Sequence, residues 1–275
     1  MTLSRPARWV FGFLALICLA FIYVPLFVVV VNSFNASKVF AWPPQSYTTD
    51  WWHAAFINQA LREAVLTSVV IAIAATAFAL ILGSLIAFAL GRYTFFGRHT
   101  ISLLIVLPLA LPGIVTALAL RTAFTPWLGT SWEWLGVAVG PTVIAAHATF
   151  CIVVVYNNVI ARLRRMGTNP EEASMDLGAG VFTTFRLVTF PLIRPALVAG
   201  AVLAFGLSFD EIVVTLFTAP ANVTTLPIWI FQSLFRPNQG PIVNAVAAVL
   251  ILISIVPVYL SQKLSGDPGH AGGAL

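Results

Sequence analysis

Two adjacent acidic residues, Asp210 and Glu211, lie inside the strongly apolar stretch from residue 195 to residue 218. An ionisable side chain within a membrane-spanning segment costs about 2.5–3.5 kcal/mol on insertion scales, so it needs a partner or a water-filled path. One interpretation is a site that attracts a cationic solute. The other is a salt bridge to Arg121, which we expect at a similar depth, and both can hold because there are two acids.

Helical periodicity separates the two acids if this stretch is one continuous helix, because adjacent residues then point about 100° apart. Asp210 falls on a mostly apolar face, and we expect it to pair with Arg121. Glu211 is expected to line a solute path together with Ser208, although a face of small residues is also typical of a tight helix–helix contact. The face of Glu211 consists of small and polar residues: Gly200, Ala204, Ser208, Thr215 and Thr218.

Other residues that could do chemistry are few. His147 is a single polar residue in another apolar stretch, where an interhelical hydrogen bond or a proton relay would explain it. An intramembrane hydrolase would need a nucleophile and a base, and nothing in the sequence pairs His147 with Ser208. Trp51 and Trp229 are candidates for cation–π contact with a solute, worth about 0.5–2 kcal/mol each, although tryptophans also gather at membrane interfaces.

The sequence argues against an enzyme. Neither lysine follows a glycine, so the Gly-Lys of a phosphate-binding loop is absent. No His-Glu-x-x-His and no paired cysteine clusters occur, so we expect no metal site. The chain is therefore expected to bind no cofactor, and any ATP it depends on must be hydrolysed by a partner.

Composition places these residues in a membrane. Of 275 residues 60% are hydrophobic and 8% charged, with a mean hydropathy of +0.97, whereas a soluble domain is about 25% charged. The sequence predicts an all-α, polytopic membrane protein with one transmembrane domain, residues 1–265, and a flexible tail, residues 266–275. Six stretches reach the roughly 20 apolar residues that a bilayer requires: residues 9–32, 63–90, 99–124, 137–160, 195–218 and 241–262.

The basic residues predict the orientation, because cytoplasmic loops of membrane proteins are rich in Lys and Arg. Ten of the 14 basic residues fall on the side of the N-terminus. Both termini are therefore expected in the cytoplasm, and the net charge of +5 needs no nucleic-acid partner to explain it. The ten are Arg5, Arg8, Arg92, Arg98, Arg162, Arg164, Arg165, Arg186, Arg194 and Lys263.

The long cytoplasmic segment, residues 161–194, is expected to fold as two short helices around a glycine hinge. Asn169-Pro170 is a helix-start signal, and the acids Glu171 and Glu172 suit the first turn of that helix. Gly178 is a plausible end. A second amphipathic segment should stop before Pro191. The segment either caps the helix bundle or docks into the groove of a partner.

The same segment carries a recognisable pattern. Glu172-Ala173-Ser174, then Gly178, then Val188-Thr189-Phe190-Pro191 resembles the EAA signature of ABC importer permeases. The resemblance implies the type I ABC importer permease fold and a coupling helix that inserts into a cytoplasmic ATPase. It assigns ATPase coupling to six residues: Glu172, Ala173, Ser174, Gly178, Ala179 and Pro191.

Other segments are similar to the second permease subunit in the spermidine/putrescine branch of this family. One departure is Gly113, where many such permeases carry Asp. The segments are Asn32–Asn35, Leu111–Val115, His147–Cys151, Leu207–Glu211, Leu226-Pro227 and Pro241–Ala245.

The resemblance implies a polyamine importer that works by alternating access in the bacterial inner membrane. Its expected partners are a homologous second permease, two ABC ATPases that use ATP and Mg²⁺, and an extracytoplasmic solute-binding protein. One alternative is an ABC permease for another small solute, such as an amino acid. Another is a self-sufficient secondary transporter, which would predict internal repeats.

Overall fold

The computed structural model describes residues 4–38, 42–128, 132–134 and 137–265, and the expected tail, residues 266–275, lies outside them. The described chain is mostly helical. It divides into two compact units, one formed by Met1–Gln59 with Ile230–Leu275 and the other by Ala60–Trp229. Each unit is described by itself.

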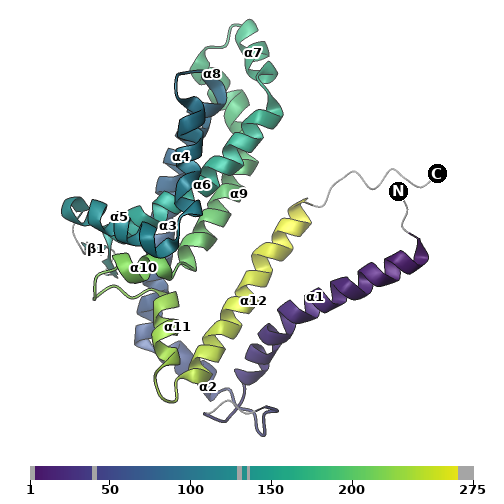
Figure 1. Cartoon of the computed structure of the whole chain (residues 1–275), viewed down its shortest axis with the longest axis vertical. Helices are drawn as coiled ribbons and strands as arrows, with labels where there is room; N and C mark the ends of the chain where they lie inside the picture. Colours follow the sequence, from purple (N-terminus) through teal and green to yellow (C-terminus); the bar gives the residue numbers. More distant parts are fainter. Residues whose placement is uncertain (1–3, 39–41, 129–131, 135–136, 266–275) are drawn as a thin grey trace. The chain divides into compact units, whose positions relative to one another are not determined.

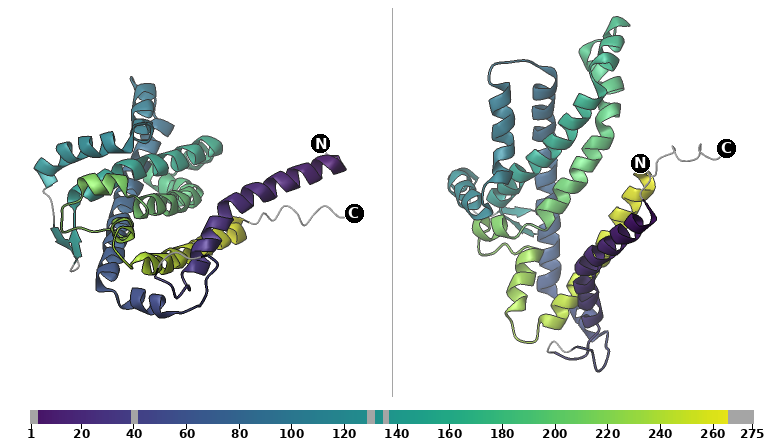
Figure 2. Two further views of the ribbon diagram at one scale, coloured as in Figure 1. Left: turned by 60° about the horizontal axis from the view of Figure 1, so that its bottom comes forward. Right: turned by 45° about the vertical axis from the view of Figure 1, so that its right-hand side comes forward.

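The first unit contains α1 (Arg5–Asn32), α2 (Asp50–Ile57) and α12 (Gly240–Ser265), and α12 packs against both of the others (Figures 1 and 2). α1 is apolar on all sides, and its most hydrophobic 18-residue window buries nothing within the chain. A helix of this kind is suited to lipid or to another subunit. The turn after α1 is held by Asn35, which donates to Asn32 Oδ1 at 3.0 Å and accepts from Trp51 Nε1 at 2.9 Å.

The second unit holds the two segments of functional interest at its two ends: α7 and α8 at one, α5, α10 and a small hairpin toward the other (Figure 1). α11 (Leu226–Leu234) crosses the boundary between the units. The elements are α3 (Gln59–Arg92), α4 (Arg98–Ala110), α5 (Gly113–Leu128), β1 (Trp132–Trp134), β2 (Val137–Val139), α6 (Pro141–Met166), α7 (Asn169–Asp176), α8 (Val181–Thr184), the π-helical turn η1 (Phe185–Thr189), α9 (Phe190–Phe209) and α10 (Val213–Thr218).

The core of the second unit is built on α6, against which α3 and α9 pack. A Cβ at Gly83 of α3 would lie 2.9 Å from the Ile152 carbonyl oxygen, and one at Gly200 of α9 would lie 3.4 Å from Val155 Cα. The first distance is too short for a Cβ, so Gly83 lets the backbones of α3 and α6 approach closely, whereas a Cβ at Gly200 would make ordinary van der Waals contact. Val155, Val159 and Leu163 of α6 are fully buried in this core.

The count of six uninterrupted spans is not confirmed. In the described residues four helices are long and apolar enough to cross a bilayer: Pro6–Asn32, Gln59–Arg92, Pro141–Met166 and Val181–Phe209. The expected span 99–124 is instead a pair of helices, α4 and α5, bent by 111°. The bend follows from Pro112, which lacks an N–H donor and holds Leu111 in an extended conformation (ψ 149°). α12 runs over 26 residues, Gly240–Ser265, and its part up to Ile253 is an apolar helix.

The expected fifth span is also interrupted. α9 ends at Phe209 and α10 begins at Val213, so Asp210 and Glu211 lie in a break and not within a continuous helix. The helical-face argument made for residues 195–218 therefore fails beyond Phe209.

Candidate functional site

The segment between α6 and α9 forms the short helix expected there. α7 begins at Asn169, with Pro170 in its first turn and both Glu171 and Glu172 near its positive end. Gly178 has φ +86°; its N–H donates to the Met175 carbonyl at 2.9 Å, and the Ala179 N–H donates to the Ser174 carbonyl at 3.1 Å. These two bonds form a Schellman motif, which confirms Gly178 as the residue that ends the helix.

The second half of the segment differs from the expectation. It does not stop before Pro191: α8, η1 and α9 follow one another without a break, so Val181–Phe209 is one continuous helix. Pro191 is tolerated because it occupies the first turn of α9 directly after the π-helical turn, where its missing N–H interrupts no α-helical ladder. Pro191 is exposed and therefore lies on the surface of this continuous helix.

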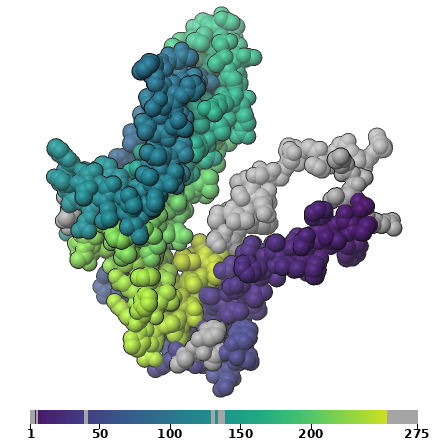
Figure 3. Space-filling view, viewed as in Figure 1, coloured from purple at the N-terminus to yellow at the C-terminus, as the bar shows by residue number. Residues whose placement is uncertain are grey.

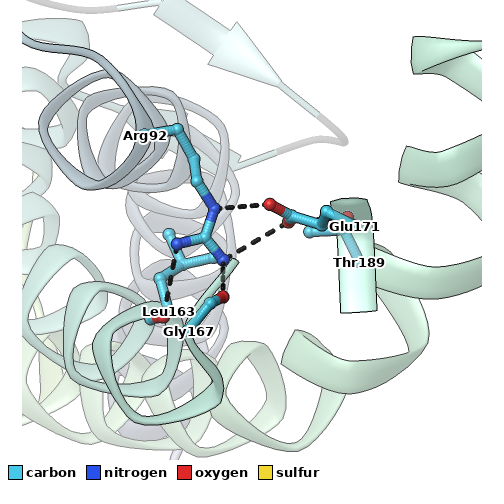
Figure 4. A network of polar contacts seen from close by, with 5 residues as sticks. All are labelled: Arg92, Leu163, Gly167, Glu171 and Thr189. Atoms are coloured by element: carbon cyan, nitrogen blue, oxygen red, sulfur yellow. Dashed lines mark hydrogen bonds and ion pairs between the residues drawn. The ribbon is translucent and has the colours of Figure 1, made fainter. Parts of the chain in front are cut away.

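An ion pair holds α7 to the rest of the unit (Figure 4). Arg92 Nε, at the end of α3, lies 2.7 Å from Glu171 Oε2, and both side chains are 14% exposed. The same guanidinium donates to the Gly167 carbonyl at 2.9 Å and to the Leu163 carbonyl at 3.4 Å. Thr189 Oγ1, in η1, donates to Glu171 Oε1 at 2.8 Å. α7 is thus bonded to α3, and through Glu171 to η1.

The outer surface of α7 and α8 combines acidic and apolar side chains. Glu172 and Ala173 are exposed, whereas Ser174 is tied to Thr184 through a 3.1 Å hydroxyl contact and Ala179 is half-buried. Exposed apolar side chains lie beside the acids, and a surface of this kind is typical of a helix that docks into an apolar groove. These apolar side chains are Met175, Leu177, Val181 and Phe182.

The two acids in the break between α9 and α10 have different surroundings. Glu211 Oε1 accepts the N–H of Val214 at 2.9 Å, so this carboxylate caps the first turn of α10. The carboxylate of Asp210 is exposed and makes no hydrogen bond or ion pair with the described residues. Both acids border a groove of about 620 Å³ whose other walls are Val154 of α6 and apolar residues of α9, among them Leu203 and Leu207.

His147 joins α6 to both sides of this break. Its Nδ1 lies 2.8 Å from Ser208 Oγ in α9, and its Nε2 lies 2.9 Å from Thr215 Oγ1 in α10. Thr215 donates its hydroxyl proton to the Glu211 carbonyl at 2.7 Å, so it must accept from Nε2–H, and Ser208 must then donate to Nδ1. This arrangement confirms the interhelical hydrogen bond expected for His147.

The pairing of His147 with Ser208 also fits a structural role better than a hydrolytic one. Ser208 is 5% exposed and Thr215 is fully buried, and neither lines the groove beside the acids. A nucleophile must be reachable by its substrate within hydrogen-bond distance of its base. In this network the hydroxyl of Ser208 is buried, and it donates its proton to His147 Nδ1.

The face of small residues is a helix–helix contact and not a water path. Gly200, Ala204 and Ser208 are buried against α6, with Cys151 Sγ donating to the Ala204 carbonyl at 3.3 Å. The structure therefore places Ser208 in this helix–helix contact and not on the groove beside the acids. The groove lies instead along the apolar face that was assigned to Asp210.

Arg121 does not form the expected ion pair. Its Nη1 donates to the Phe217 carbonyl at 3.2 Å, near the far end of α10, and the described residues place no acid within 4 Å of it. We expected Arg121 and Asp210 at a similar depth because we assumed that both helices were straight. The bend before α5 and the break before α10 change the direction of these helices. A Cβ at Gly113 would lie 3.4 Å from Val213 Cγ1, so the bend and the break lie beside each other. Figure 3 shows the teal surface of α5 adjoining the green surface of α10.

Both candidate tryptophans contact other parts of the protein. Trp229 is 5% exposed, so its ring faces are covered by the core. Trp51 is half-buried in the first unit and donates its indole N–H to Asn35. The described residues bring no three His, Cys, Asp or Glu side chains together as a metal site.

Comparison with known proteins decides the family. Residues 79–265 match the model of the binding-protein-dependent transport system inner membrane component family, which is more than half of the chain. The chain belongs to this family.

The permease has curated relatives along most of its length. It is 36% identical over 249 residues to the spermidine/putrescine transport system permease protein PotC of Escherichia coli (strain K12), covering 90% of each chain. It is 35% identical to the putrescine transport system permease protein PotI of the same organism, covering 88% of this chain and 87% of that one. The permease is thus a multi-pass component of the inner membrane and belongs to a transport system.

A solved structure supports the fold. A chain in the crystal structure of a bacterial ABC transporter involved in the import of the acidic polysaccharide alginate aligns with a TM-score of 0.67, at 14% identity, over 95% of the permease and 99% of that chain. At this identity the likeness establishes the ABC importer permease fold and says nothing of the solute.

Two residues of the site could not be identified from the sequence. Arg92 and Thr189 lie 79 and 18 positions from Glu171, and no local pattern connects them. Glu171 itself was recognised only as an acid in a first helical turn. The sole available signal for Arg92 was an arginine at the end of an apolar stretch, which the positive-inside pattern already explains.

Proposed function

We propose that the permease is one transmembrane half of an ATP-driven importer for polyamines or a closely related small polycation. The proposal is supported by the spermidine/putrescine and putrescine permeases to which the chain is 35–36% identical. The observation in this chain that carries it is the exposed carboxylate of Asp210 on the groove between α6 and α9. An unpaired anion at that position suits an ammonium group, which gives up water to enter the path.

The proposed path lies along this groove and is completed by a second subunit. The groove is open to the surface and not an enclosed cavity, so a further subunit is needed to close it. A homologous second permease is the partner we propose. In that assembly Asp210 attracts an ammonium group while Glu211 holds α10 in place, which reverses the roles that helical periodicity gave them.

Energy and solute delivery come from other chains in this proposal. Two ABC ATPases hydrolyse ATP with Mg²⁺ at the cytoplasmic side, where the exposed face of α7 and α8 docks into them. An extracytoplasmic solute-binding protein delivers the solute to the other side. Both termini are cytoplasmic, and the permease changes between outward-open and inward-open states by alternating access.

Uptake by cells tests the solute class. A strain lacking this gene, alone or complemented with it, is given radiolabelled putrescine or spermidine with a hundredfold excess of unlabelled competitor. We expect uptake only with the gene, competition by other polyamines, and no competition by arginine, lysine or neutral amino acids. Gene-dependent uptake of an amino acid without uptake of either polyamine would reject the polyamine assignment while leaving the transport role intact.

A further inference from the structure

We infer that Arg92 and Thr189, acting through Glu171, are positioning residues that fix the coupling helix α7 to the transmembrane helices and carry its movement into them. The inference rests on the proposed docking of α7 into an ATPase. It adds a set of residues that touch neither the solute nor, in this proposal, the ATPase.

The guanidinium of Arg92 joins the ends of two long helices. It belongs to the last residue of α3 and donates to carbonyls of the last turn of α6 and the residue after it, Leu163 and Gly167. Carbonyls at a helix C-terminus have no partner within the helix and carry partial negative charge, so a cation there satisfies and stabilises them. Arg92 is therefore held in one orientation before it meets Glu171.

The carboxylate of Glu171 joins that arrangement to the other side of α7. It makes two contacts with Arg92, at 2.7 and 3.3 Å, and accepts the hydroxyl of Thr189 at 2.8 Å (Figure 4). The Nη2 contact is a hydrogen bond and the Nε contact is an ion pair, so the carboxylate is held at two points of the guanidinium. One carboxylate at the start of α7 is thereby connected to α3, α6 and η1.

The location of Thr189 adds a reason to expect movement here. Thr189 is 3% exposed and lies in η1, the π-helical turn that joins α8 to the long helix α9. π-Helical turns are rare and occur preferentially at functional sites. A displacement of α7 acts through Glu171 on Thr189 and so on the start of α9, and through Arg92 on the ends of α3 and α6.

An ordinary surface salt bridge would not serve this purpose, because exposed ion pairs contribute little and exchange with water. This pair differs in its burial, its two contacts, and the three further hydrogen bonds that hold its members. Arg98 offers a matched comparison. It is a half-buried arginine six residues farther along, and its side chain has no hydrogen bond or ion pair to the described residues.

The test uses the complete importer, with its permease partner, ATPase and binding protein, reconstituted in vesicles. Complex yield, ATP hydrolysis and solute uptake are measured for Arg92→Gln, Glu171→Gln, their double variant, Thr189→Val and Thr189→Ser. Arg98→Gln is the control, and Gly178→Val reports independently on α7. We expect Arg92→Gln and Thr189→Val to assemble and hydrolyse ATP but to lose at least about fivefold in uptake per ATP, the lower end of typical coupling factors.

Three further results are expected if these residues act as one unit. The double variant should lose no more than the worse of its two single variants, because the pair is already broken. Thr189→Ser, which retains the hydroxyl, should keep the normal ratio of uptake to ATP hydrolysis. Arg98→Gln should also keep it. If Arg92→Gln lowers complex yield, the comparison of Thr189→Val with Thr189→Ser decides.

The outcomes separate this inference from the proposed function. An unchanged ratio in Arg92→Gln and Thr189→Val, together with a lowered ratio in Gly178→Val, would overturn the inference and leave α7 as the coupling helix. An unchanged ratio in all variants, Gly178→Val included, would reject the coupling role of α7 itself. An equal loss in Thr189→Val and Thr189→Ser would show that packing matters at that position and would also overturn the inference.

Discussion

Adjacent residues of the same charge have different tasks in this permease. Glu211 uses its carboxylate to cap α10, whereas the carboxylate of Asp210 is exposed on the groove without a protein partner. A capping acid is satisfied by the backbone and is replaceable by any side chain that offers an acceptor. An exposed acid in an apolar groove is replaceable only by another negative charge, if its task is to attract a cation.

These tasks predict opposite responses of the two acids. Asp210→Asn should assemble normally but lower uptake of a polycation about tenfold or more, the loss of one charge-assisted contact of about 1.5–3 kcal/mol. Glu211→Gln should retain the cap and lower transport less, whereas Glu211→Ala should lower complex yield, since a lost cap costs about 1 kcal/mol.

Complex yield by size-exclusion chromatography and uptake per assembled complex measure these responses, with Glu133→Gln as a control at an exposed acid on β1. Normal uptake by Asp210→Asn would remove the cationic site from the groove. A large loss of uptake in Glu211→Gln with normal assembly would return the transport role to Glu211.

His147 should matter for stability more than for transport. His147→Ala leaves the hydroxyls of Ser208 and Thr215 buried with one partner fewer, and each such loss costs about 1–3 kcal/mol. Thermal unfolding of the detergent-solubilised complex should therefore shift to lower temperature. Thr149→Ala is the matched control on α6, because Thr149 bonds only the backbone of its own helix, and it should change stability by less than about 0.5 kcal/mol.

A proton relay would give a different result for His147. If His147→Gln, which can still bridge two hydroxyls, keeps the unfolding temperature but abolishes uptake, a purely structural role is wrong. Equal unfolding temperatures for His147→Ala and the unchanged protein would contradict the network itself.

At the scale of elements, the end of α7 depends on one backbone conformation. Gly178 has φ +86°, and a Cβ there would meet no atom within 4 Å. The positive φ, and not a lack of space, is therefore what disfavours a side chain at this position. Gly178→Val should strain this turn by at least about 1–2 kcal/mol and lower solute-stimulated ATP hydrolysis in vesicles, with the chain still present in the membrane.

Gly180 provides the control for Gly178. It has the same free space but an extended conformation with φ −71°, so Gly180→Val should couple normally. Gly178→Asn should be intermediate, because Asn tolerates positive φ. Unaltered stimulation in Gly178→Val would show that the turn does not position α7.

The sequence predicted elements where the signal is local and failed where it is not. Gly178 was recognisable because a helix end has a chemical signature within a few residues, and α7 followed from Asn169-Pro170. Pro112 itself indicated the bend, but the long run of apolar residues favoured one straight span. The break at Asp210 had no local signal, because neither Gly nor Pro lies there. His147, more than 60 positions away, forms the hydrogen bonds that hold this break.

At the scale of the whole molecule, the positive-inside pattern makes a prediction that depends on no contact in the structure. In a background with Cys18→Ser and Cys151→Ala, Ser46→Cys should react with an impermeant maleimide on intact cells. Thr168→Cys should react only after the cells are opened. Both positions are exposed on the chain, so a lack of reaction reflects the membrane and not burial. Reaction of Thr168→Cys from outside would invert the orientation.

The π-helical turn fixes the direction in which the residues before it face around the axis of α9. A π-helix closes its hydrogen bonds over one more residue than an α-helix, so η1 accommodates one extra residue between α8 and α9. Deleting a residue from Phe185–Thr189 would restore an α-helix and rotate everything before it by about 100° around the axis of α9. The apolar side chains of Val181 and Phe182 would then face a different direction while every helix kept its length. Evolution of this segment is therefore expected to tolerate substitutions more readily than insertions or deletions.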